Sequence, residues 1–190
     1  MLNLHSLEEY DKIRPDFRAK VMLAKRTRQI QLGEHLRLLF ENKLTIQYQI
    51  QEMLRIEKIF RQAEIQEEID AYAPLITDRQ NLKATMMLEY PDVGKRREML
   101  GKLIDIEKKV WLQVGDLDKI YPVANEDLKR QTEDKTSAVH FLRFPITNEA
   151  LTTLEGGASL KFGVEHELYN FWIDASKEIR DSLLLDLQEN

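Results

Sequence analysis

Two spacings of apolar residues occur along this chain of 190 residues. Apolar residues at every third or fourth position predict amphipathic helices, and strict alternation predicts strands with one buried face. Because both patterns are present, we expect an α+β fold, with a largely antiparallel sheet of about 4–6 strands packed by helices. The prediction is a single domain over 1–190, with the helical segment 6–28 as a candidate appendage.

The N-terminal segment begins with helix signals. Ser6 and Glu9 have the spacing of a capping box, which predicts a short helix. That helix should stop before Arg14 and Pro15, because proline disfavours helical backbone in the residue before it. Pro15 then suits the first turn of a second helix. The apolar face of the second helix would contain Phe17, Val21 and Ala24.

Residues 29–40 fit two structures. Alternation in 29–32 and again in 36–40 flanks Gly33, which can turn, and this favours a β-hairpin. The alternative is one long helix interrupted at Gly33. In the hairpin, the inward side chains would be Ile30, Leu32, Leu36, Leu38 and Phe40.

The rest of the pattern predicts further helices and strands. We expect strands at 82–89, 110–114, 138–144 and 160–164. The strand 138–144 should be central, because both of its faces are mostly apolar. We expect helices from the capping residue Asn42 to about Phe60, and over 62–72, 93–104, 147–156 and 171–187. The polar run from Asn125 to Thr136 is predicted to be a long exposed loop.

Composition limits the classes of protein. Hydrophobic residues make up 43% of the chain, enough for a folded core, and the net charge is −5. An acidic chain is not a general nucleic-acid binder, and the basic residues between Lys12 and Arg28 are interpreted as the solvated face of a helix. The N-terminus lacks the features of a signal peptide, and no apolar stretch approaches the roughly 20 residues of a membrane span. We therefore expect a cytoplasmic protein.

Cysteine is absent, which excludes disulfides, thiolate metal sites and cysteine nucleophiles. None of the histidines, His5, His35, His140 and His166, has the spacing of a known helical metal motif. Glycine spacings typical of phosphate-binding loops are missing as well. We therefore predict no metal and no cofactor, and we interpret the Glu165–Glu167 segment as a polar strand end.

Polar residues on the helix after Asn42 form the first part of a candidate site. Asn42, Gln49, Glu52 and Glu57 are its members. At about 100° per residue, Glu57 projects onto the apolar face of this helix, where a carboxylate is costly unless it is paired. It could act as a general acid or base, or as a metal ligand. The structural alternative is a salt bridge to Arg61 or an exposed helix end.

His140 and Arg143 complete the candidate site on the predicted central strand. They point to opposite faces, and His140 shares its face with Leu142 and Phe144. This favours a buried structural histidine over a catalytic one. Arg143 could anchor a carboxylate or phosphate, although a structural pair with an acidic side chain is the more common arrangement.

Several blocks of residues resemble a known family. These blocks are Arg14-Pro15, Phe40-Glu41-Asn42 with Thr45, Gln49–Arg55 with Glu57, Asn125-Glu126-Asp127 and Ser137–Phe141. Together they resemble an uncharacterised bacterial family, domain of unknown function 3501, over roughly 14–169. The helical block is fairly specific because so many polar residues fall within it.

The resemblance implies a role by association. Genes of this family tend to lie beside those for rubrerythrin and for an iron–sulfur oxidoreductase subunit, which suggests peroxide or iron-linked redox metabolism. A chain without cysteine is poorly equipped to be the redox carrier itself. The leading hypothesis is therefore a non-catalytic accessory protein that binds such an enzyme. The alternative is an enzyme with a polar site around the 42–57 helix and His140, with metal assistance as one version.

Overall fold

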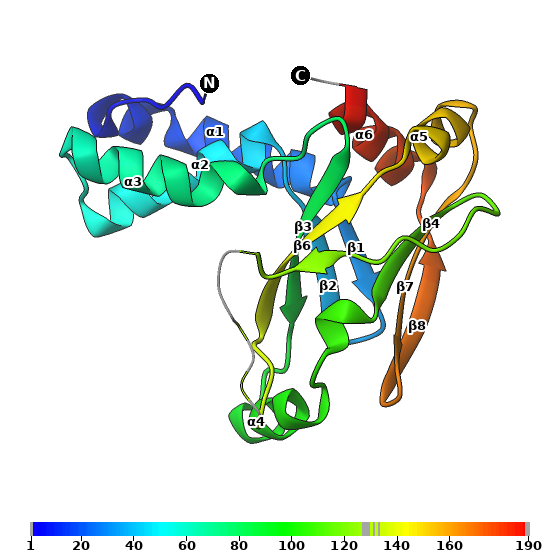
Figure 1. Cartoon of the computed structure of the whole chain (residues 1–190). Coiled ribbons are helices and arrows are strands. Elements are labelled where there is room, and N and C mark those ends of the chain that lie inside the picture. The colour runs from blue at the N-terminus through cyan, green and yellow to red at the C-terminus, as the bar shows by residue number, and fades with distance from the viewer. Residues whose placement is uncertain (1, 127–129, 131, 133, 189–190) are drawn as a thin grey trace.

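Two antiparallel sheets share one apolar core in the computed structural model, which describes residues 2–126, 130, 132 and 134–188 (Figure 1). Within these residues, one sheet has five strands in the order β1-β2-β3-β6-β5, and the other has three in the order β4-β7-β8. The strands of the larger sheet are β1 (Gln29–Leu32), β2 (Leu36–Phe40), β3 (Asn81–Leu88), β6 (Val139–Pro145) and β5 (Val123–Ala124). Those of the smaller sheet are β4 (Val110–Val114), β7 (Leu160–His166) and β8 (Tyr169–Asp174).

The core forms from alternate residues of each strand. In β3, Leu82, Ala84, Met86 and Leu88 are buried, whereas the residues between them face outward and are partly exposed. The 3-10 helix η2 (Ile106–Lys108) and the short helix α5 (Asn148–Glu155) add apolar side chains to the same core. The last helix, α6 (Lys177–Gln188), completes it with Leu183 and Leu187.

The remaining helices form a layer beside the sheets, at the upper left of Figure 1. This helical layer consists of α1 (Leu7–Arg26), α2 (Lys43–Glu57), α3 (Gln62–Tyr72) and the 3-10 helix η1 (Ala73–Leu75). Its own small apolar cluster is built around Ile46, Ile50 and Leu54 of α2. Helix α4 (Val93–Lys102) lies at the opposite end of the larger sheet.

The α+β prediction is confirmed, and so are the hairpin at 29–40 and its five inward residues, all of which are buried. The predicted strands at 82–89, 110–114, 138–144 and 160–164 correspond to β3, β4, β6 and β7. Strand β6 lies between β3 and β5. The expected loop 125–136 falls partly outside the described residues.

One predicted break in the N-terminal helix is wrong. Helix α1 runs without interruption from Leu7 to Arg26, with Pro15 inside it. A proline inside a helix costs about 3 kcal/mol. Packing on both sides of Pro15 offsets this cost, because Tyr10 and Val21 are both buried.

Two other boundaries differ from the prediction. Residues 169–174 form strand β8, paired with β7, whereas a helix from about Phe171 was expected. Aromatic and β-branched residues in this segment fit a pleated edge, and only the residues from Lys177 onward form the helix. Helix α2 ends at Glu57 rather than near Phe60, because Lys58 adopts a left-handed conformation with φ 55°.

Candidate functional site

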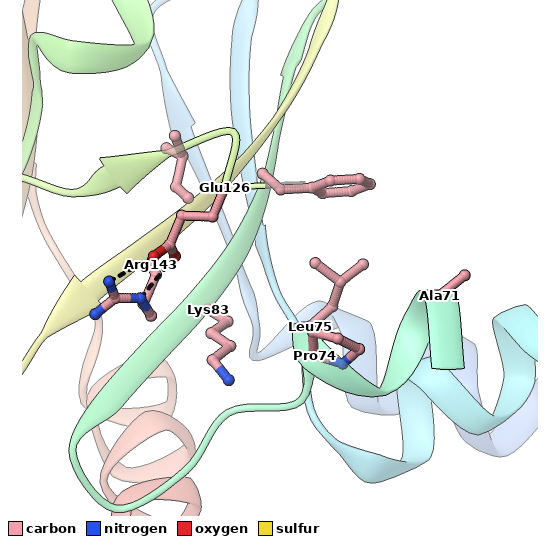
Figure 2. Close-up of a pocket in the computed structure, with 8 residues that line it drawn as sticks. Ala71, Pro74, Leu75, Lys83, Glu126 and Arg143 are labelled. Atoms are coloured by element: carbon pink, nitrogen blue, oxygen red, sulfur yellow. Dashed lines mark hydrogen bonds and ion pairs between the residues drawn. The ribbon is translucent and has the colours of Figure 1, made fainter. Parts of the chain in front are cut away.

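A cavity of about 450 Å³ lies between η1 and the outer face of β3 and β6 (Figure 2). Its size falls in the range typical of small-molecule sites. One wall is apolar and the other carries charged side chains. The lining residues are Ala71, Pro74, Leu75, Lys83, Glu126, Phe141, Leu142 and Arg143. We refer to it below as the η1 cavity.

Arg143 is held at the η1 cavity by a two-bond ion pair with Glu126. Its Nε donates to Oε2 and its Nη2 to Oε1 of Glu126, each at 2.7 Å. The Nη1 atom donates to Oδ1 of Asn81 at 3.0 Å. The hydrogen bond with Glu126 raises the pKa of Arg143 and lowers the pKa of Glu126. The predicted pairing of Arg143 with an acidic residue is therefore observed.

Lys83 brings a second cation to the same wall. It is the direct cross-strand neighbour of Arg143, so the two side chains leave the sheet on one face. Its Nζ lies 3.2 Å from Oδ2 of Asp78. Asp78 also accepts hydrogen bonds from the backbone of Gln80 and the side chain of Asn81. Each cation at the η1 cavity thus has a carboxylate partner on a neighbouring loop.

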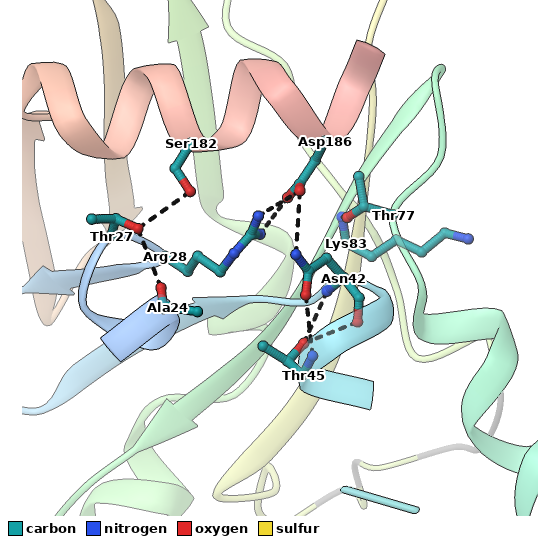
Figure 3. A network of polar contacts seen from close by, with 9 residues as sticks. All are labelled: Ala24, Thr27, Arg28, Asn42, Thr45, Thr77, Lys83, Ser182 and Asp186. Carbon is teal, nitrogen blue, oxygen red and sulfur yellow. Dashed lines mark hydrogen bonds and ion pairs between the residues drawn. The ribbon is translucent and has the colours of Figure 1, made fainter. Parts of the chain in front are cut away.

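Asn42 belongs to a different, structural network (Figure 3). It caps α2: its Oδ1 accepts from the backbone of Thr45 at 3.1 Å, and Thr45 Oγ1 accepts from the backbone of Asn42 at 2.9 Å. Its amide also donates to Asp186 of α6 at 3.4 Å. Asp186 forms a buried two-bond ion pair with Arg28. The predicted helix cap is confirmed, and Asn42 connects α2 to α6.

Glu52 links α2 to α1. Its carboxylate accepts from Arg14 at 2.7 and 2.9 Å, from Tyr10 at 2.8 Å and from Arg55 at 3.1 Å. The Arg14 hydrogen bond, supported by those from Arg55 and Tyr10, outweighs the effect of burial and lowers the pKa of Glu52 to about 2. Burial and the bond to Glu52 raise the pKa of Tyr10. This cluster holds the two longest helices of the layer together.

Gln49 and Glu57 lie on the solvent side of α2. Both side chains are exposed. Glu57 is the last residue of α2, and its side chain is exposed at the helix end instead of buried on the apolar face. Arg61, the partner considered for Glu57, lies 3.7 Å from Glu64 instead. The exposed helix end is the structure observed.

His140 is fully buried on the core side of β6, as its alternation with Arg143 predicted. Its Nε2 lies 2.9 Å from Thr136 Oγ1 and 3.0 Å from the Ser137 carbonyl oxygen. Its Nδ1 lies 3.0 Å from the Asn125 amide. Burial lowers the pKa of His140, opposed by the nearby carboxylate of Glu107. The contacts are those of a histidine satisfied within the fold.

The sequence-predicted residues therefore do not converge on one site. Asn42 joins the Asp186 network, Glu52 binds α1, and His140 faces the core. Gln49 and Glu57 are exposed. Arg143 alone among these candidates lines the η1 cavity. Lys83 and Glu126, which line the cavity with it, were not predicted as site residues, because only the strand register and a distant loop bring them to Arg143. Glu126 was noted only within the Asn125-Glu126-Asp127 block of the family resemblance.

A second feature, missed from the sequence, occupies the smaller sheet. Both tryptophans of the chain lie on its outer face in one cross-strand row, with Gly163 between Trp111 and Trp172. Trp111 covers the glycine: a Cβ on Gly163 would stand 2.2 Å from its ring. The Lys119 Nζ lies 4.4 Å from the Trp111 ring centroid and also pairs with Glu165. Glu165 is thus held in a surface ion pair at the strand end.

Strand β8 is the outermost strand of this sheet and is unusually apolar on its surface. Trp172 is 63% exposed on one face, and Phe171 and Ile173 are 46% and 43% exposed on the other. Leu168, just before the strand, is 60% exposed. We call these four residues the β8 surface. Tyr169 anchors the strand: its hydroxyl donates to the Leu32 carbonyl oxygen at 2.7 Å.

Clusters of metal ligands and membrane-spanning helices are both absent from the described part of the chain. No group of three or more His, Asp or Glu side chains there is placed to hold a metal ion. No helix in those same ranges is long and apolar enough to cross a membrane.

Comparison with known proteins places the chain among uncharacterised relatives. No curated protein matches it significantly. A crystal structure of a novel protein of unknown function from Burkholderia pseudomallei K96243 is similar, with 44% sequence identity and a TM-score of 0.93. The match covers 98% of this chain and 99% of that one. The model of a family described as protein of unknown function, DUF3501, matches residues 2–187, and the chain belongs to this family.

Proposed function

We propose that this protein is a non-catalytic accessory protein that binds another protein through the β8 surface. The observation that supports the proposal is an apolar edge strand exposed on both faces. Edge strands expose backbone groups that can pair with another chain, and natural proteins usually protect them with charges or prolines. Within β8 the only charged residue is Asp174.

The arrangement of the β8 surface favours strand addition. A partner that packed on one face alone would cover either Trp172 or the Phe171 and Ile173 pair. An extended segment aligned along the edge would contact both sets, with backbone hydrogen bonds providing affinity and side chains specificity. Exposed tryptophan is also typical of the residues that dominate binding energy at interfaces.

We further propose that the partner is a redox enzyme of the rubrerythrin or iron–sulfur oxidoreductase type. This part rests on the family resemblance and on the absence of cysteine from the chain. The accessory role is supported by the internal pairing of the predicted polar residues, since Glu52 and Asn42 are engaged in contacts that hold helices together.

The test measures binding of purified rubrerythrin, and separately of the iron–sulfur subunit, to the full chain by biolayer interferometry. Trp172→Ser should weaken binding at least about tenfold, the equivalent of about 1.4 kcal/mol. Phe60→Ser is the matched control, because Phe60 is 66% exposed but lies beside the helical layer. No binding of either enzyme to the unmodified chain would refute the proposed partner class. An equal loss of affinity in Trp172→Ser and Phe60→Ser would refute the β8 surface as the binding site.

A further inference from the structure

We propose that the η1 cavity binds a small organic carboxylate that carries an apolar group, and that Glu126 occupies the position of the ligand carboxylate in the present structure. The proposal concerns a small molecule and does not depend on the β8 surface. It rests on the geometry of Arg143, the character of the two walls and the exposure of Glu126.

Arg143 presents a carboxylate-binding edge to the cavity. Its Nε and Nη2 atoms bind both oxygens of Glu126 at 2.7 Å (Figure 2). This parallel two-bond arrangement matches a planar carboxylate and explains the choice of ligand class. A ligand carboxylate could form the same two bonds on the same edge once Glu126 moves away.

Glu126 is more exposed to solvent than Arg143. Its side chain is 51% exposed, whereas that of Arg143 is 32% exposed. Released from Arg143, the Glu126 carboxylate would be solvated at little cost. Arg143 would keep its bond to Asn81 and remain aligned. Exchange of one carboxylate for another therefore leaves the charge balance at Arg143 unchanged.

The surroundings favour a negative ligand with an apolar body. Lys83, 16% exposed, adds a cation beside Arg143, and the guanidinium carbon of Arg130 lies 4.4 Å from the Phe141 ring centroid. Opposite the cations, Pro74 and Leu75 form an apolar wall, and Phe141 adds an aromatic ring on the sheet face that carries Arg143. A cavity of about 450 Å³ accepts a group of the size of a benzene ring.

The experiment titrates the full chain with acetate, benzoate, phenylacetate and phenyl phosphate, followed by NMR shifts of backbone amides. Glu126→Gln removes the competing carboxylate and should tighten benzoate or phenylacetate binding by about tenfold or more over the unmodified chain. Arg143→Gln should abolish it. In the unmodified chain and in Glu126→Gln, acetate, which lacks the apolar group, should bind more weakly than benzoate, and phenyl phosphate more weakly than phenylacetate.

The control is Arg37→Gln, because Arg37 lies on the neighbouring strand β2, pairs with Glu89 and does not line the cavity. It should bind like the unmodified chain. Thermal melts confirm that each variant is folded. The proposal is overturned if Glu126→Gln binds neither aromatic carboxylate at millimolar concentration, or if Arg143→Gln binds them as Glu126→Gln does. It is also overturned if the shifts map outside the cavity.

Discussion

Arg28 and Asp186 form a buried two-bond ion pair that joins the start of the first hairpin to the last helix (Figure 3). Their side chains are only 6% and 4% exposed, and 158 residues separate them along the chain. Asn42 also donates to Asp186, so the capped end of α2 meets the same point. The helical layer, the larger sheet and α6 are thus connected through one carboxylate.

Asp186→Asn should destabilise the protein by about 3–5 kcal/mol, because it leaves the charge of Arg28 buried without its partner. The double variant Arg28→Met/Asp186→Leu should recover a large part of that loss, since neither buried charge remains. Urea unfolding followed by circular dichroism measures both values. A double variant no more stable than Asp186→Asn would contradict this account.

Gly163→Ala should lower the free energy of unfolding by about 1–3 kcal/mol, the usual cost of overpacking. The new methyl group would overlap the Trp111 ring, so the indole must move. The emission maximum of tryptophan fluorescence should shift as Trp111 becomes more exposed. Gly94→Ala is the control: the nearest atom to its added methyl group is a side-chain oxygen of Asp92 at 3.3 Å, and alanine favours the helix. Its stability should stay the same or rise.

Glu52→Gln should cost about 2 kcal/mol, because charged hydrogen bonds from Arg14 and Tyr10 are lost between α1 and α2. Glu57→Gln should change the melting temperature little, because Glu57 is exposed. A large effect of Glu57→Gln would show that this carboxylate has a partner in solution.

The Glu52 carboxylate should also contribute to acid unfolding. Its pKa is lowered to about 2 in the fold from the ordinary value of 4.5, so its stabilisation is present above about pH 4.5. That stabilisation should disappear as the pH falls from about 4.5 to 2. Over this interval the stability of Glu52→Gln should depend less steeply on pH than that of the unmodified chain.

His140 should make the protein less stable below about pH 6.5. Burial lowers its pKa, so the unfolded chain takes up a proton on this residue more readily than the folded one. Stability from the neutral imidazole is therefore present above about pH 6.5 and declines as the pH falls below it. His140→Asn should reduce the slope of stability against pH in urea titrations between about pH 5 and 7. A slope unchanged by the substitution would assign the effect to other groups.

The local pattern of apolar and polar residues was sufficient to predict the elements whose contacts lie close in sequence. Alternation around Gly33 predicted the hairpin, and Asn42 was recognised as a helix cap. Pro15 and the segment 169–174 were misjudged because tertiary contacts decide them: packing on α2 maintains the helix through Pro15, and pairing with β7 holds β8 extended.

The candidate site was less predictable for the same reason. Strand alternation predicted that His140 faces the core and that Arg143 faces outward, because the direction of each side chain depends only on its position in its own strand. The neighbours of Arg143 depend on tertiary structure. The register of β3 against β6 places Lys83 directly opposite Arg143, and Glu126 reaches Arg143 from a loop. The spacing of residues along the sequence does not predict such contacts between distant segments.

The pairing of Arg28 with Asp186 has a consequence for how the chain folds during its synthesis. A ribosome completes the first hairpin long before it synthesises α6. Arg28 therefore has no ion-pair partner until Asp186, 158 positions later in the chain, has been added. Leu183 and Leu187, which close the core, arrive with it. The nascent chain therefore exposes part of its apolar interior until α6 leaves the exit tunnel, and during that interval it should be a substrate for chaperones and proteases.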